Sequence, residues 1–278
     1  MQEKEGMFKS NDGTDIVWMA WLPEGKPKAV INIIHGYDEH IRRYANVVNE
    51  LVPDGYAVFG VDHRGHGKSG GRRCHVDSFN EYIIDELKFM RDIIKKEYPD
   101  TPLFILGHSM GSIIAMNLVE NHPEGIKGVV LSGSGSYHGP KTKKSDILLS
   151  KIGSKLFPKV HIKFPLAPDF ITHDPGILDA YINDKLRCGK ITPRLAEQLM
   201  TFLIEGARNA GMIKMPLMLQ YGTLDISFSK QKELFDSVGS TDKTYKSYEG
   251  FKHEVYNEMP EMRAVALKDL HDWLNARI

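Results

Sequence analysis

The pentapeptide GHSMG at 107–111 places one serine between two glycines, each two positions away. A short apolar run precedes it and a helical pattern follows at 113–118. This arrangement predicts a nucleophile elbow, a sharp turn from strand to helix that exposes a reactive hydroxyl. Side chains at Gly107 and Gly111 would collide with the neighbouring strand and helix. We therefore predict that Ser109 is a nucleophile; the alternative is an ordinary turn whose serine caps the helix.

A serine hydroxyl needs a general base, and the base needs an acidic side chain to orient it. In folds with this elbow the chain order is nucleophile, acid and histidine, each after a strand. Asp225 follows an apolar run at 217–221, and His253 follows a strand pattern at 244–248. We predict Asp225 as the acid and His253 as the base. The alternatives are a turn-forming aspartate and a surface histidine that caps a helix.

Acyl transfer also needs two N–H donors for the negative charge that develops on the substrate oxygen. Met110, directly after Ser109, is expected to supply one from its backbone at the start of the helix. The second is expected from the loop at 35–40, with Tyr37 as the donor. His35 is expected to shape this loop by hydrogen bonding.

These side chains need a scaffold that brings the ends of several strands together. Residues 7–22 predict an antiparallel hairpin around the turn signal at 11–13. Apolar runs then alternate with helical patterns: runs at 29–34, 56–61, 103–106 and 126–131, and helical patterns at 41–52, 78–97 and 254–276. This alternation predicts an α/β fold with a mostly parallel, doubly wound sheet.

The alternation stops after Ser132 and resumes only near the acid. The intervening segment has glycine and proline punctuation but no convincing core strand. We predict a core formed by 1–133 and 211–278, and a mainly helical cap at 134–210 that covers the site. Apolar residues at helical spacing in 147–157 predict a cap helix packed on the core. The alternative is a lid that lines an acyl tunnel or touches a membrane surface.

Length and composition limit the function classes. The chain has 278 residues, 41% hydrophobic and 26% charged, as in a soluble globular protein. Its 36 basic and 36 acidic residues balance, so nucleic acid is not an expected partner. The two cysteines, Cys74 and Cys188, fit a reducing compartment, and no signal peptide or membrane-spanning run is visible. We expect a cytoplasmic protein.

Two other patterns suggest a cofactor or metal, and neither is well supported. Residues 65–70 match a dinucleotide fingerprint formally, but no helix begins there and the preceding strand is not the first. Histidines and acids gather at 35–40, and His63 lies near His66, without a recognised zinc spacing. No cofactor and no metal are expected.

Five separated segments resemble the monoacylglycerol lipase and lysophospholipase group of serine α/β hydrolases. They are HGYDEH at 35–40 with Arg43 and Tyr44 close behind, DHRGHGKS at 62–69, GHSMG at 107–111, YGTLD at 221–225 and YEGFKH at 248–253. The resemblance covers about 8–132 and 215–276 and is weak in the cap. Within it, Ser112 replaces a common third glycine and Lys185 replaces a usual proline.

The resemblance implies an α/β-hydrolase fold and a serine ester hydrolase that acts on small lipid esters, with monoacylglycerols as the leading substrates. It implies Ser109, Asp225 and His253 as the triad, and Tyr37 and Met110 as the oxyanion donors. Lysophospholipids and short- or medium-chain esters are the alternative substrates. A catalytically silent, ligand-binding hydrolase is the alternative class. A transient contact of the cap with a membrane surface is left open as an alternative.

Overall fold

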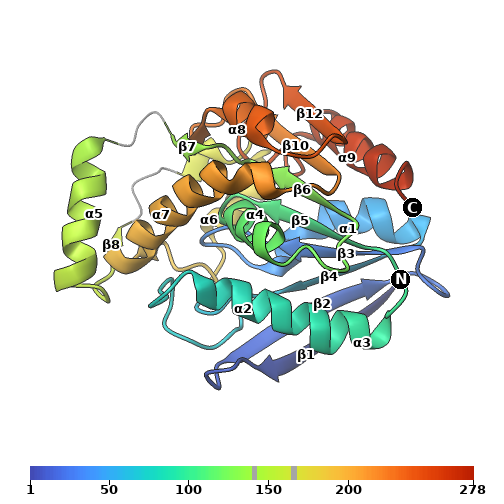
Figure 1. Ribbon diagram of the computed structural model, residues 1–278, viewed down its shortest axis with the longest axis horizontal. Helices are drawn as coiled ribbons and strands as arrows, with labels where there is room; N and C mark the ends of the chain where they lie inside the picture. The colour runs from blue at the N-terminus through green and yellow to red at the C-terminus, as the bar shows by residue number, and fades with distance from the viewer. Residues whose placement is uncertain (140–142, 164–167) are drawn as a thin grey trace.

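The first two strands form the antiparallel hairpin that the turn signal predicts. β1 (Gln2–Lys9) pairs with β2 (Asp15–Leu22) along their whole length. The computed structural model describes residues 1–139, 143–163 and 168–278, and Figure 1 traces the chain through them. β2 also pairs with β4 in antiparallel fashion, so the hairpin extends one edge of the central sheet.

Within these residues the central sheet has eight strands in the order β1-β2-β4-β3-β5-β6-β10-β12. From β4 onward in that order, all neighbours run parallel. These strands are β3 (Ala29–Ile34), β4 (Tyr56–Val61), β5 (Leu103–His108), β6 (Gly128–Ser132), β10 (Leu217–Gly222) and β12 (Lys243–Tyr248). Every residue of β3, β4 and β5 is buried, because helices cover both faces. The predicted mostly parallel α/β sheet is confirmed.

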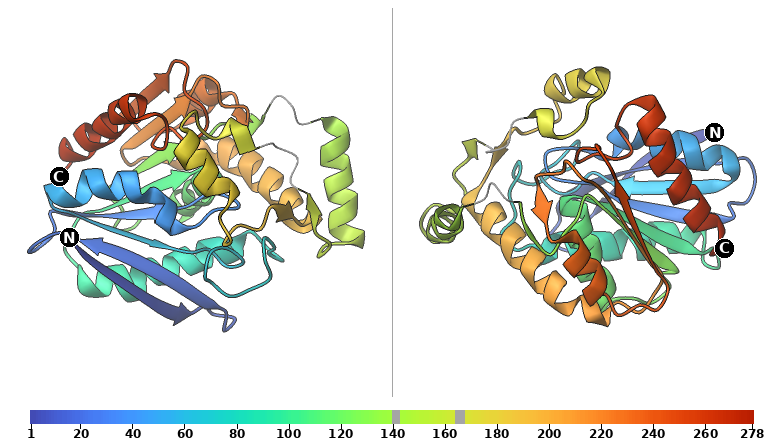
Figure 2. Two further views of the ribbon diagram at one scale, coloured as in Figure 1. Left: turned by 180° about the vertical axis from the view of Figure 1, so that it is seen from behind. Right: turned by 90° about the horizontal axis from the view of Figure 1, so that it is seen from above.

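Helices lie on both faces of the sheet (Figure 2). One face carries α1 (Ala45–Leu51), flanked by 3₁₀ turns at Ile41–Tyr44 and Val52–Asp54, and α9 (Pro260–Asn275). The other face carries α2 (Asn80–Phe89), which continues through a π turn at Met90–Ile94 into α3 (Lys95–Glu97), together with α4 (Met110–Asn121) and α8 (Gln231–Ser237). Each face therefore has its own apolar core. The helix α8 is absent from the sequence prediction.

Between β6 and β10 the chain leaves the sheet. Its elements there are β7 (Tyr137–His138), α5 (Lys144–Leu156), β8 (Ile162–Lys163), a 3₁₀ turn at Pro168–Phe170, α6 (Pro175–Ile182), β9 (Lys190–Ile191), α7 (Pro193–Asn209) and a 3₁₀ turn at Ala210–Met212. β7 pairs with β11 (Phe228–Ser229), and β8 pairs with β9. Among these helices, α5 packs mainly on α7, away from the sheet (Figure 1). α7 in turn lies over α4 of the core. The expectation that the helix near 147–157 packs on the core is therefore wrong.

The closing helix begins later than the pattern at 254–276 predicts. The backbone N–H groups of His253 and Glu254 donate to the carbonyls of Phe170 and Ile171, at 3.4 and 2.8 Å. These bonds hold the segment against the insertion instead of in a helix. Pro260, which has no N–H group to leave unsatisfied, then starts α9.

A polar pair lies inside the core, between the sheet and α2. The Asn32 side-chain amide donates to Glu86 Oε2 at 2.8 Å, and both residues are fully buried. Burial raises the pKa of Glu86 to about 8, although the bond from Asn32 favours the charged form. The nearby His63 ring, 3.6 Å from Glu86 Oε1, stays neutral because burial lowers its pKa to about 3. Glu86 is therefore a neutral acid near pH 7.

This buried acid predicts a stability that falls with pH. In the unfolded chain Glu86 ionises near its ordinary pKa of 4.5, whereas the folded protein keeps the proton up to about pH 8. The free energy of unfolding should fall across this interval, by roughly 4–5 kcal/mol from this residue. Glu86→Gln keeps an acceptor for Asn32 and cannot ionise. In urea unfolding at several pH values, the variant should lack this decline; parallel curves for both proteins would contradict the prediction.

Candidate active site

Ser109 occupies the turn between β5 and α4, as the elbow prediction requires. Its backbone has φ 54° and ψ −120°, a left-handed conformation that a non-glycine residue adopts only under tertiary constraint. The Ser109 N–H donates to the Ser132 carbonyl on β6 at 3.0 Å. The Ser109 carbonyl accepts from the N–H and the hydroxyl of Ser112, at 2.9 and 2.6 Å. The turn is thus fixed by the neighbouring strand and by the first turn of α4.

The two glycines of the pentapeptide are required by close backbone contacts. A Cβ at Gly111 would lie 1.9 Å from the Ile34 carbonyl oxygen. A Cβ at Gly107 would lie 2.5 Å from the Gly111 carbonyl oxygen and 2.8 Å from the Ala115 side chain. The predicted collisions are therefore confirmed, and they explain the spacing of the motif.

Asp225 and His253 come together at the ends of the neighbouring strands β10 and β12. Their loops are joined by backbone hydrogen bonds, including Leu224 N–H to the Phe251 carbonyl at 2.9 Å. His253 Nδ1 donates to Asp225 Oδ2 at 2.8 Å, and the Ser227 N–H donates to Asp225 Oδ1 at 2.7 Å. Asp225 is thereby held by two donors, and the far nitrogen of His253 is left for another partner.

The charges of this pair suit a general base. Burial alone would lower the pKa of His253, but the adjacent Asp225 carboxylate outweighs it and raises that pKa. Burial would likewise raise the pKa of Asp225, but His253 and the bond from Ser227 lower it. Asp225 therefore stays ionised and holds the proton on His253 Nδ1. The ring of His108, 4.8 Å from that of His253, stays neutral because burial lowers its pKa to about 3.

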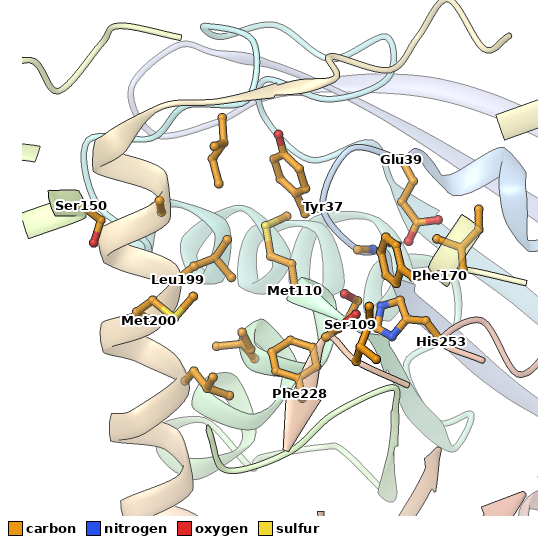
Figure 3. A pocket seen from close by; sticks show the side chains of 18 of the residues that line it. Tyr37, Glu39, Ser109, Met110, Ser150, Phe170, Leu199, Met200, Phe228 and His253 are labelled. Atoms are coloured by element: carbon orange, nitrogen blue, oxygen red, sulfur yellow. Dashed lines mark hydrogen bonds between the residues drawn. The ribbon is translucent and has the colours of Figure 1, made fainter. Parts of the chain in front are cut away.

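Ser109 and His253 line one cavity of about 630 Å³. Figure 3 shows both side chains at the same end of it, below Tyr37 and beside Phe170. The remaining wall is mostly apolar and comes largely from the segment between β6 and β10: Ile147, Leu149, Ile162, Phe170, Ile171, Ile191, Ala196, Leu199, Met200 and Leu203, with Ile226 and Phe228 beyond it. The structure therefore places a reactive end and a long apolar end in one space.

The two predicted oxyanion donors lie on the same wall as Ser109. Met110 is the first residue of α4, so its N–H has no acceptor within the helix. Tyr37 lies in the loop after β3, where a Cβ at Gly36 would sit 3.1 Å from the Ser109 Cβ. The absence of a side chain at Gly36 lets this loop approach the nucleophile closely. The Tyr37 hydroxyl donates to the Lys190 carbonyl.

A buried ion-pair network beside His253 is missing from the sequence prediction. Arg43 donates to both carboxylate oxygens of Glu254, at 2.7 and 2.9 Å, and to Glu39 Oε2 at 2.8 Å. Glu39 also accepts from the Gly36 N–H and the Tyr44 hydroxyl, at 2.5 and 2.8 Å. The network therefore joins the loop at Gly36 to the segment that carries His253. In the sequence, the spacing of Glu39 and Arg43, four positions apart, is the one local pattern that indicates an ion pair here.

The described residues contain neither a metal-binding cluster nor a membrane-spanning helix. No group of three or more histidines, cysteines, aspartates and glutamates is arranged there to hold a metal ion. Likewise, no helix in that part of the chain is both long and apolar enough to span a bilayer.

Comparison with known proteins places the chain in a family. The family model for serine aminopeptidase, S33, matches residues 25–260. The chain belongs to this family. It is 32% identical to the monoacylglycerol lipase of Mycolicibacterium smegmatis, over 97% of this chain and 96% of that protein. It is 33% identical to phospholipase YtpA of Bacillus subtilis, over 86% of this chain and 93% of that protein.

A solved structure agrees with this assignment. The monoacylglycerol lipase of Paleococcus ferrophilus superimposes with a TM-score of 0.83 at 27% identity, and each chain is covered completely. The predicted α/β-hydrolase fold and the resemblance to the lipase and phospholipase group are thereby confirmed. The protein is a hydrolase of the S33 family. The roles of its individual site residues stay predictions.

Proposed function

We propose that this S33 hydrolase cleaves monoacylglycerols to a fatty acid and glycerol. One observation carries the proposal: an apolar cavity of about 630 Å³ begins at Ser109 and His253. Its volume lies in the range of roughly 300–1,000 Å³ typical of small-molecule sites. An acyl chain placed in the apolar end would bring its ester carbonyl to Ser109. The lipase relatives support the same substrate class.

The proposed mechanism uses the five predicted residues. His253 Nε2 takes the proton of the Ser109 hydroxyl as its oxygen attacks the ester carbonyl, and Asp225 stabilises the imidazolium that forms. The backbone N–H groups of Tyr37 and Met110 bind the oxyanion. The imidazolium then protonates the departing glycerol oxygen, leaving an acyl-serine. Water, deprotonated by the same ring, hydrolyses the acyl-serine and releases the fatty acid.

The charges near the reactive end favour a neutral headgroup. An aminopeptidase needs a free carboxylate for the substrate ammonium, but Glu39 and Glu254 are both paired with Arg43. A lysophospholipid needs a cation for its phosphate, and Arg43 is committed to those carboxylates. The other acidic and basic side chains that line the cavity, Asp146 and Lys163, lie in α5 and β8 of the cap. A glycerol headgroup carries neither charge. This balance supports monoacylglycerols over lysophospholipids and peptides.

We propose the division of the chain that the sequence predicts, with a core at 1–133 and 211–278 and a cap at 134–210. Its support is that β6 and β10 are neighbours in the sheet, whereas within the segment between them β8 pairs with β9 and α5 packs on α7. The cap would then determine the acyl chain that fits. A cytoplasmic location is also proposed, since both cysteines are free thiols.

A substrate panel tests this function. Purified protein would be assayed on monoacylglycerols of increasing chain length, on lysophosphatidylcholine and on an aminoacyl anilide, in matched detergent. The expected result is the highest kcat/KM on a monoacylglycerol. A higher value on lysophosphatidylcholine would reassign the protein as a lysophospholipase, and cleavage of the anilide alone would reassign it as a peptidase.

The cap also offers a surface for a transient membrane contact. Leu148, Leu156 and Phe157, on and just after α5, are 59%, 65% and 62% exposed. Lys151 and Lys155 are exposed on the same helix. Apolar side chains flanked by lysines are typical of helices that lie at a lipid interface. We propose that this face of α5 contacts the membrane from which substrate is taken.

Leu156→Ser with Phe157→Ser tests the contact. The double variant should bind vesicles several-fold more weakly in co-sedimentation and should hydrolyse vesicle-borne monoacylglycerol more slowly, because less apolar surface enters the lipid. Neither position lines the cavity, so hydrolysis of a water-soluble short ester should be unchanged. Val265→Ser on α9, which is 53% exposed, is the matched control. Equal vesicle binding by wild type and double variant would reject the contact.

A further inference from the structure

The loop that carries Tyr37 is fastened to the cap by a buried aspartate. Asp38 Oδ2 accepts from Arg187 Nε and Nη2, at 3.1 and 2.7 Å. Asp38 Oδ1 accepts from the backbone N–H groups of Cys188 and Gly189, at 2.6 and 2.8 Å. Asp38 is 1% exposed, and its four acceptor sites are all used. These four hydrogen bonds compensate the carboxylate for the loss of water on burial.

Residues on either side of Asp38 contact the same cap segment. The Tyr37 hydroxyl donates to the Lys190 carbonyl, and His40 Nε2 lies 2.7 Å from Asp184 Oδ2. The Arg187 guanidinium stacks on the Tyr181 ring at 3.5 Å, which fixes its orientation. We call the segment 184–190 the cap clasp. It contacts the loop at Tyr37, Asp38 and His40.

The backbone of Asp38 indicates that these contacts impose a specific loop conformation. Its φ of 59° lies in the left-handed region, which costs a non-glycine residue roughly 1 kcal/mol or more. Aspartate tolerates this region better than most residues do. The four bonds to the cap clasp offset the cost. Without them, the loop would lose the constraint that holds its conformation.

This conformation matters because Tyr37 directly precedes Asp38. Before Tyr37, the loop is held at Gly36, whose N–H donates to Glu39. Glu39 in turn pairs with Arg43 of the core. The proposed oxyanion donor therefore lies between an anchor in the core and an anchor in the cap. An oxyanion donor works only when its N–H is aimed beforehand at the developing charge. A shift of about 1 Å in such a group can cost on the order of 100-fold in rate.

We propose that Asp38 is a positioning residue for acyl transfer: by holding the cap clasp it aims the Tyr37 N–H, so the oxyanion hole is complete only when the clasp is docked. This inference rests on the proposed function, specifically on Ser109 as nucleophile and Tyr37 as donor. It adds that the cap controls the chemical step as well as the fit of the acyl chain.

Two substitutions change the carboxylate of Asp38 while still allowing the positive φ that its backbone adopts. Asp38→Gly adopts a positive φ freely but removes both carboxylate oxygens and the four hydrogen bonds that they accept. Asp38→Asn also tolerates a positive φ and keeps one oxygen for the Cys188 and Gly189 N–H groups, while losing the charge that faces Arg187. Asp77→Asn is the matched control, because Asp77 pairs with His75 and with Lys159 of the cap, at 3.2 and 3.6 Å, and not with the Tyr37 loop.

The assay uses p-nitrophenyl acetate, whose acetyl group is too short to reach the apolar end. A fluorophosphonate that labels Ser109 counts the competent sites, so kcat is expressed per labelled site. Asp38→Gly should lower this kcat by about 10- to 100-fold and change KM by less than about threefold. Asp38→Asn should lose less, and Asp77→Asn should match wild type. The Ki of a trifluoromethyl ketone, which forms an oxyanion on Ser109, should rise in parallel with the loss of kcat.

A purely structural role for Asp38 would give a different pattern. Thermal stability and the labelled fraction would fall, while kcat per labelled site and the ketone Ki would stay at wild-type values; that result would overturn the inference. A change in KM alone would overturn it too. Wild-type protein that cleaves p-nitrophenyl acetate but no monoacylglycerol would remove the proposed substrate and leave this test intact.

Discussion

Ser109→Ala is expected to lower kcat for ester hydrolysis by about 10⁴- to 10⁶-fold while the protein stays folded. In the proposed mechanism the Ser109 hydroxyl oxygen is the atom that becomes acylated, and an alanine side chain has no oxygen to replace it. Ser109 already occupies its strained backbone conformation because Gly107 and Gly111 allow close contacts with α4 and β3. Removing one oxygen leaves those contacts in place. The melting temperature should therefore shift by no more than a few degrees.

The measurement is kcat on a chromogenic short-chain ester, together with labelling by a fluorophosphonate. Ser112→Ala is the matched control, because Ser112 lies three residues on, and its hydroxyl bonds the Ser109 carbonyl without lining the cavity. It should keep a rate within about tenfold of wild type, since only one hydrogen bond is lost. Ser109→Ala with wild-type turnover, or with undiminished labelling, would show that the nucleophile is another residue.

Asp225→Asn is expected to lower kcat by about 10³- to 10⁴-fold. Asp225 accepts the proton on His253 Nδ1, which leaves Nε2 unprotonated and able to act as a base. An asparagine amide at this position can donate to Nδ1 instead. The ring would then carry its proton on Nε2, where it cannot accept one from Ser109. The loss follows from the tautomer and not from a change in fold.

The same substitution should move the pH dependence of the residual rate. In the proposed mechanism His253 must be neutral to accept a proton. The wild-type rate is therefore expected to rise as pH passes the His253 pKa, which Asp225 holds above the ordinary value of 6.5. Without that carboxylate, burial lowers the His253 pKa and is opposed only by the weaker influence of Glu254 and Glu39. The rising limb of kcat/KM against pH should therefore shift to lower pH. Asp236→Asn, which alters an exposed pair with Lys232, should leave both rate and limb unchanged. Coincident limbs for wild type and Asp225→Asn would contradict the assignment.

The features predicted best are those set by short-range geometry or by strand order. The elbow requires α4 to contact β3 so closely that Gly111 has no room for a Cβ. The glycine positions of the pentapeptide indicate this contact. The pairing of Asp225 with His253 follows because parallel strands end at one edge of the sheet, so the loops after β10 and β12 must meet. The hairpin follows from its turn residues. Each of these features depends on a few residues that are close together in the sequence or on the order of the strands, so the sequence predicts it.

The features that were not predicted depend on partners far apart in the chain. Arg43 and Glu254 are 211 positions apart, and Asp38 and Arg187 are 149 apart. No local pattern marks such a pair, because each member is an ordinary charged residue until the fold buries it. The late start of α9 has the same origin, since bonds to Phe170 and Ile171 hold residues that would otherwise be helical.

The residue types and their order along the chain determine the proposed reaction chemistry, because sterics at the elbow and the strand order of a parallel sheet leave few choices for nucleophile, acid and base. Tertiary packing alone decides what surrounds them. The contact of α5 with α7 and the grip of the cap clasp on Asp38 shape the cavity and the loop at Tyr37. Burial and charge pairing act between distant segments, so selectivity and the aim of the oxyanion donor arise only in the folded chain.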